Sequence, residues 1–108
     1  MPIKLTQEER IARAMSEAEL STCVKNLALA FNYLAYHTWM SKHSQKGFPD
    51  WTFVKDGRLI FAELKKQLKK PEREQQQWLD EINKCHGVEA YCWRPSDWLD
   101  GTICKILS

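Results

Sequence analysis

The sequence is poor in the features that build fibrous, disordered or membrane-spanning chains. Its 108 residues include only four glycines and four prolines, with 44% hydrophobic and 28% charged residues. This composition excludes a collagen-like or broadly disordered protein and fits a single globular domain. No run of 18 or more apolar residues occurs, so we expect no membrane span. The opening MPIKLTQEER lacks the apolar core of a signal peptide, which predicts a cytoplasmic protein.

Cysteine is present, but without the spacing of a metal or redox site. Cys23, Cys85, Cys92 and Cys104 form no C-x-x-C pair. Three of them stand beside apolar residues, where a free thiol behaves as a small hydrophobic group, and a cytoplasmic setting disfavours disulfides. Cys85, His86 and Cys92 together match no familiar zinc pattern. The cysteines therefore give scarcely any support to a thiol- or zinc-dependent regulator.

The net charge is only +2, but it is unevenly distributed. Residues 1–41 are neutral overall, residues 42–73 hold nine basic and four acidic side chains, and residues 74–108 carry a net −3. The central basic band predicts a surface that faces phosphates. A solvated, lysine-rich face explains the same pattern, so charge alone leaves both interpretations open.

Periodicity and cap signals predict an α/β chain. We expect helices at about 7–15, 17–31 and 71–85 and from 95 towards the chain end, a loop over 40–49, and strands at about 34–38, 51–55, 58–65 and 88–93. The order of these elements predicts a mixed central sheet with helices packed around it.

Two capping boxes separate the roles of two nearby acidic residues. Thr6-x-x-Glu9 and Ser16-x-x-Glu19 each match the pattern that opens a helix. Glu19 is thereby predicted to cap its helix. Glu17 lies one turn before Leu20 on the apolar face, so we expect its carboxylate to point towards the interior.

A predicted hairpin brings two further carboxylates together. Asp56-Gly57 is a strong two-residue hairpin signal. A hairpin centred there pairs residues whose numbers add to about 113, which places Asp50 opposite Glu63. Strand alternation also puts Glu63 and Lys65 on one face, about 6.5–7 Å apart.

Carboxylates this close repel each other unless a proton or a cation lies between them. A hard divalent cation such as Mg²⁺ suits an oxygen-rich site with few protein ligands. Each residue taken alone has a simpler interpretation: Glu63 in an ion pair with Lys65, and Asp50 capping a turn. The joint pattern, G-x-P-D followed by E-x-K in a hairpin inside a basic band, favours the metal site.

The segment GFPDWTFVKDGRLIFAELK resembles the PD-(D/E)-x-K nuclease core, specifically its VRR-NUC branch. Four further segments extend the resemblance over about residues 16–107: Ser16-Glu17, Tyr36-His37-Thr38, Gln75-x-x-Trp78-Leu79 and Trp93-Arg94-Pro95-Ser96-Asp97. The resemblance implies a restriction-endonuclease-like αβββαβ core, with residues 1–15 as a helical extension and 16–108 as the nuclease domain. Asn32, Ser21 and the short loop 40–46 depart from the pattern of many relatives.

The resemblance also implies roles for individual residues. Asp50, Glu63, the Leu64 carbonyl and Glu17 would hold Mg²⁺ or Mn²⁺, and Lys65 would hold or deprotonate the attacking water. Gln75 would orient the lysine, the water or a phosphate oxygen; its alternative role is a hydrogen bond to a buried strand carbonyl. The DNA backbone would be contacted by Lys42, Lys46, Lys66, Lys69, Lys70 and Arg73.

The roles of two histidines and two tryptophans remain open. His37 and His43 are candidate DNA contacts, although a hydrogen-bonded histidine at a strand end is the commoner case. Trp39 and Trp51 are candidates for stacking on unpaired bases. Core packing is the favoured role for Trp51.

The function that the resemblance implies is Mg²⁺-dependent hydrolysis of DNA by an endonuclease of the small phage or bacterial type. Such an enzyme would act in the cytoplasm, the host's if phage-encoded, as a homodimer on branched or Holliday-junction-like DNA. The alternative is a non-catalytic DNA- or protein-binding module on the same fold.

Overall fold

The computed structural model describes residues 4–39 and 45–108. The predicted DNA contact Lys42, together with His43, lies outside the described residues. The elements in chain order are α1 (Gln7–Ala14), α2 (Glu17–Ala30), β1 (Leu34–His37), β2 (Trp51–Lys55), β3 (Arg58–Leu64), α3 (Arg73–Asn83), β4 (Val88–Trp93), α4 (Pro95–Leu99) and α5 (Thr102–Leu107). Within the described ranges, no helix is long and apolar enough to cross a bilayer.

The first two helices begin where their caps predict. Ser16 and Glu19 make both bonds of the capping box of α2, at 3.0 and 3.1 Å. Thr6 caps α1 through one bond, from the amide of Glu9 at 3.0 Å. These bonds satisfy amides that the first turn of a helix leaves without partners.

Two predicted helices have different bounds in the structure. The helix expected over 71–85 begins at Arg73, because the amide of Glu72 donates to Gln75 Oε1 at 2.7 Å and fixes the cap there. It ends at Asn83, whose side chain instead pairs with both backbone groups of Ala90 in β4. The helix expected from residue 95 is two helices, α4 and α5, since Gly101 lies between them with φ +83°.

The four strands form one mixed sheet in the order β1-β2-β3-β4. β1 and β2, like β2 and β3, are antiparallel, and β3 and β4 are parallel. The turn at Asp56-Gly57 has positive φ at both residues, as a two-residue hairpin requires. Trp51 pairs with Ala62, which confirms the predicted register.

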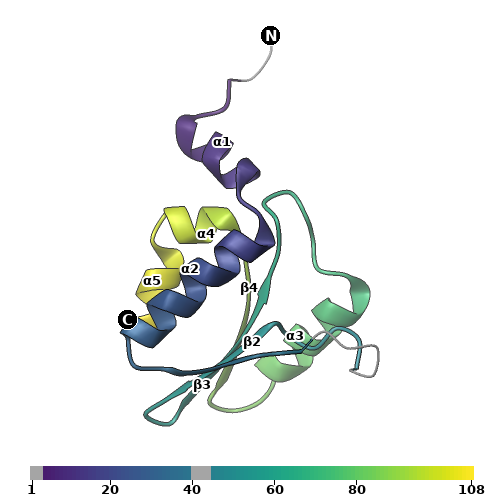
Figure 1. Cartoon of the computed structure of the whole chain (residues 1–108). Helices are drawn as coiled ribbons and strands as arrows, with labels where there is room; N and C mark the ends of the chain where they lie inside the picture. The colour runs from purple at the N-terminus through teal and green to yellow at the C-terminus, as the bar shows by residue number, and fades with distance from the viewer. Residues whose placement is uncertain (1–3, 40–44) are drawn as a thin grey trace.

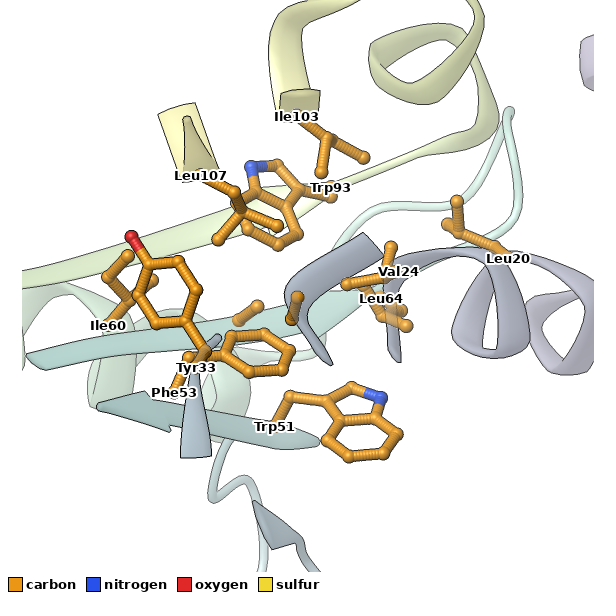
Figure 2. Packing of buried hydrophobic residues seen from close by; sticks show 12 residues of the cluster. Leu20, Val24, Tyr33, Trp51, Phe53, Ile60, Leu64, Trp93, Ile103 and Leu107 are labelled. Atoms are coloured by element: carbon orange, nitrogen blue, oxygen red, sulfur yellow. The ribbon is translucent and has the colours of Figure 1, made fainter. Parts of the chain in front are cut away.

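Helices cover the two faces of the sheet unequally. Figure 1 shows α2, α4 and α5 gathered on one side and α3 on the other. The main core lies between the sheet and α2 and α5, and Figure 2 shows Trp93 beside Ile103 and Leu107. Phe53, Ile60 and Leu64 point into this core and are almost fully buried. Alternation along β3 therefore turns Phe61, Glu63 and Lys65 towards the face that α3 covers.

The end of the sheet near the Asp56-Gly57 turn is held by an ion pair. Arg58 donates from Nε and Nη2 to the two carboxylate oxygens of Glu89, at 2.6 and 2.7 Å, and from Nη1 to Tyr33 and to the carbonyl of Ile106. This arrangement joins β3, β4 and the C-terminal helix. Asp50 and the carboxyl end of β3 lie at the opposite end of the hairpin.

Candidate metal centre

Asp50 and Glu63 meet where β2 begins and β3 ends. Asp50 directly precedes β2, and the β2–β3 register places it opposite Glu63. The amide of Leu64 donates to Asp50 Oδ2 at 2.8 Å, which holds the aspartate against the end of β3. The structure therefore brings together the two carboxylates that the hairpin spacing predicts to be neighbours.

Glu63 is an unusual carboxylate because it is 2% exposed. Burial raises its pKa to about 9, and its interaction with Asp50 and the negative charges of Asp50 and Glu17 add to this effect, while the charge of Lys65 opposes it. Without a cation, the pair therefore retains a proton at neutral pH.

The two oxygens of Glu63 have different surroundings. Oε1 accepts a hydrogen bond from Gln75 Nε2 at 3.2 Å. Oε2 is buried and has no hydrogen-bond partner among the described residues. Burying an oxygen without a hydrogen-bond partner destabilises the folded state unless a proton or a cation lies beside the oxygen.

A pocket of about 300 Å³ opens beside this pair. It is lined by Glu17, Ala18, Ser21, His37, Asp50 and Leu64. Glu17 thus borders the site from the first turn of α2, whereas Glu19 is engaged in the cap. The prediction that Glu17 points to the interior is wrong, because it is exposed at the open pocket instead of packed in the core.

These donors suit a hard divalent cation. Asp50 and Glu63 supply carboxylate oxygens, Leu64 borders the pocket, and the unpartnered Glu63 Oε2 needs positive charge beside it. No cluster of three or more histidine, cysteine or acidic side chains in ligating geometry occurs in the described part of the chain. Mg²⁺ suits a site with so few protein ligands, since it retains several waters and is commonly held by one or two carboxylates.

Lys65 and Gln75 both act on Glu63. The charge of Lys65 lowers the pKa of Glu63, and its backbone amide donates to the Trp93 carbonyl at 3.0 Å. Gln75 Nε2 bonds the Glu63 carboxylate, whereas its Oε1 accepts from Glu72 in the cap of α3. Gln75 therefore orients a site carboxylate, and its hydrogen bond runs to this side chain instead of to a strand carbonyl.

The predicted basic residues lie on exposed surface. Lys66, Lys69, Lys70 and Arg73 are exposed along the segment from β3 to α3. The Nζ atom of Lys46 lies 3.9 Å from a carboxylate oxygen of Glu72 and 3.8 Å from one of Glu74, so its charge is partly offset.

The segment from β3 to α3 is held by two hydrogen bonds that the sequence analysis missed. Arg94 Nε donates to the Lys69 carbonyl, and the Ser96 amide donates to Gln67 Oε1.

His37 lines the pocket, and its ring packs against that of Trp51. Trp51 is 5% exposed and its Nε1 donates to Ser21 Oγ at 2.9 Å. Of the two roles considered for Trp51, core packing is the one the structure shows. His37, at the end of β1, lies with its ring centroid 4.6 Å from that of Trp51. From the sequence, His37 is considered only as a DNA contact or a hydrogen-bonded histidine at a strand end, and Ser21 only as a departure from the family pattern, so neither of them is placed beside the acidic pair.

Glu17 and Glu19 provide a matched pair of substitutions. We expect Glu17→Ala to weaken Mn²⁺ binding by about three- to tenfold, because one negative charge leaves the pocket wall. Glu19→Ala should leave Mn²⁺ affinity unchanged and lower the urea midpoint of unfolding, since it removes half of the capping box. Calorimetric Mn²⁺ titration and urea unfolding of both variants check this assignment. The opposite pattern would contradict it.

Comparison with solved structures identifies the fold. A solved structure described as a VRR_NUC domain superposes with a TM-score of 0.69 and 23% sequence identity, over 83% of this chain and 96% of that chain. No protein-family model and no curated protein matches the sequence. The chain therefore has the VRR-NUC fold, as the sequence motifs predicted.

Proposed function

We propose that this protein is a metal-dependent DNA endonuclease that hydrolyses phosphodiester bonds. The observation that carries the proposal is the Asp50–Glu63 pair, with its unpartnered buried oxygen, beside Lys65 in a nuclease-type fold. A chain that only bound DNA would have no use for a buried glutamate with a raised pKa beside a second carboxylate.

Each site residue has a distinct role in this proposal. Asp50, Glu63 and the carbonyl of Leu64 would hold Mg²⁺ or Mn²⁺, with Glu17 acting directly or through water. The cation, when bound, polarises the phosphate and lowers the pKa of bound water. Lys65 holds or deprotonates the attacking water and offsets charge on the phosphate in the transition state. Gln75 keeps the Glu63 carboxylate oriented.

DNA would approach along the exposed basic segment. Lys66, Lys69, Lys70 and Arg73 offer positive charge next to the strand that carries Glu63 and Lys65. Such residues contact phosphates without reading sequence, which suits recognition of DNA shape. One such site cuts one strand, so a twofold homodimer would supply two sites for branched or Holliday-junction-like DNA. Residues 16–108 would form the nuclease domain, with 1–15 as an extension whose helix packs against α4.

The proposal is tested by cleavage of single-stranded, duplex, flap and four-way DNA with and without Mg²⁺ or Mn²⁺. We expect cutting that requires the metal and falls at least about 10³-fold in Asp50→Asn and in Lys65→Ala. Lys84→Ala, which alters an exposed pair with Glu81 at 2.9 Å, is the matched charge control and should cut normally.

Two other outcomes have clear meanings. Cutting that survives both site substitutions would contradict the assignment of the site. Metal-independent binding of DNA with no cutting of any substrate would contradict the enzyme and support the binding module.

A further inference from the structure

The segment before Asp50 crosses α3 more closely than a side chain would permit. Gly47 has φ +95°, and a Cβ added there would lie 2.6 Å from the backbone carbon of Glu74 and 2.7 Å from its oxygen. The obstruction is helix backbone, which does not move aside as the end of a flexible side chain does. Glycine is therefore required here both for its conformation and for the contact itself.

The residues on either side of Gly47 are also attached to α3. Trp78 Nε1 donates to the carbonyl of Lys46 at 3.2 Å. The ring of Phe48 meets Trp78 and Phe61 edge-to-face, with centroids 5.1 and 5.7 Å apart. A hydrogen bond, a backbone contact and an aromatic pair thus hold three consecutive residues on one helix.

The next two residues, Pro49 and Asp50, are also held in place by contacts with other elements. Pro49 is fully buried, and Thr38 Oγ1 donates to its carbonyl at 2.7 Å. The amide of Thr38 donates to the carbonyl of Asp50 at 2.8 Å, and the Asp50 carboxylate accepts from the Leu64 amide. The position of Asp50 is therefore set by β1 and β3 together with the segment that α3 holds.

Helix α3 also contacts the other half of the acidic pair. Gln75, one turn before Trp78, bonds Glu63 Oε1 at 3.2 Å. Residues 74 and 78 of the same helix contact the segment that leads to Asp50. We propose that Gly47 and Trp78 are positioning residues that clamp this segment to α3 and so hold Asp50 in register with Glu63. The consequence for metal binding rests on the proposed function, but the clamp itself does not.

The clamp is tested without metal by amide hydrogen exchange. The Leu64 amide reports on Asp50, because it donates a hydrogen bond to the Asp50 carboxylate. In Gly47→Ala we expect exchange at Leu64 to accelerate at least about tenfold beyond the other amides of β3. Gly101→Ala is the matched control, since Gly101 has a similar φ of +83° but nothing within 4 Å of an added Cβ. In this control, hydrogen exchange at Leu64 should change only as much as exchange at the other β3 amides.

Mn²⁺ titration extends the test to the metal site. We expect Gly47→Ala to weaken Mn²⁺ binding at least about tenfold and Gly101→Ala to leave it unchanged. Trp78→Phe retains an aromatic ring but loses the hydrogen bond to Lys46, so we expect it to weaken Mn²⁺ binding about three- to tenfold. If Gly47→Ala does not fold, both the hydrogen exchange and the Mn²⁺ titration are measured on Trp78→Phe instead.

The outcomes separate the two proposals. In Gly47→Ala or Trp78→Phe, a change in exchange at Leu64 no larger than that at the other β3 amides would overturn the clamp. If the wild-type protein binds Mn²⁺, equal Mn²⁺ affinity in Gly47→Ala and Gly101→Ala would overturn it too. A wild-type protein that binds no Mn²⁺ would refute the metal centre of the proposed function. The clamp would then still be upheld or overturned by Leu64 exchange alone.

Discussion

Replacing Glu63 by glutamine is expected to make the metal-free protein more stable while abolishing the proposed metal-dependent cleavage of DNA. Burial raises the pKa of Glu63 from 4.5 to about 9. Between these pH values the folded protein keeps a proton that the unfolded chain releases, so stability falls as pH rises through this window. Glutamine is neutral at every pH and avoids this loss. At pH 8 we expect a gain of about 2–4 kcal/mol in the free energy of unfolding.

Urea unfolding in EDTA at pH 5 and pH 8 measures this effect. The variant and the wild-type protein should differ by less than about 1 kcal/mol at pH 5, because this pH lies only just above the pKa of 4.5 that Glu63 has in the unfolded chain. Glu8→Gln, which removes an exposed carboxylate of α1, should follow the wild-type protein at both pH values. A variant less stable than the wild-type protein at pH 8 would contradict the raised pKa of Glu63.

Metal affinity is expected to rise steeply with pH. A cation at the Asp50–Glu63 pair must displace the proton that Glu63 retains below about pH 9. We therefore expect Mn²⁺ affinity to increase about tenfold per pH unit from about pH 6 to pH 8.5, and to level off above the pKa.

Calorimetry in buffers with different ionisation enthalpies counts the released protons. About one proton should leave per Mn²⁺ bound at pH 7. Binding that is independent of pH over this range would place the metal away from Glu63. A release close to zero at pH 7 would mean that the carboxylate is already ionised in the metal-free protein.

The acidic pair was predictable because its geometry is local. The Asp56-Gly57 turn sets the register of two adjacent strands, and strand alternation then decides which side chains share a face. Nothing distant in the sequence is needed to place Asp50 opposite Glu63. The capping box at Ser16 is local in the same way, so the role of Glu19 as a cap was predictable from the sequence.

The features that escaped prediction depend on contacts between distant segments. Glu63 is buried because α3 covers its face of the sheet, and the bond from Gln75 exists only once that helix has packed. The exposure of Glu17 depends on where the first turn of α2 ends relative to the pocket. Gly47 is recognisable as the first residue of the G-x-P-D motif, but its contact with the backbone of Glu74 is visible only in the structure.

Cleavage by Glu63→Gln is the most direct test of the metal-dependent nuclease. The wild-type protein and the variant would be compared on four-way and duplex DNA in Mg²⁺ and in Mn²⁺, at equal concentrations of folded protein. Because the variant is expected to be the more stable of the two, lost activity cannot be attributed to unfolding. We predict cutting by the wild-type protein only with metal, and a rate at least about 10³-fold lower for Glu63→Gln. Metal-dependent cutting by Glu63→Gln at the wild-type rate would contradict the account.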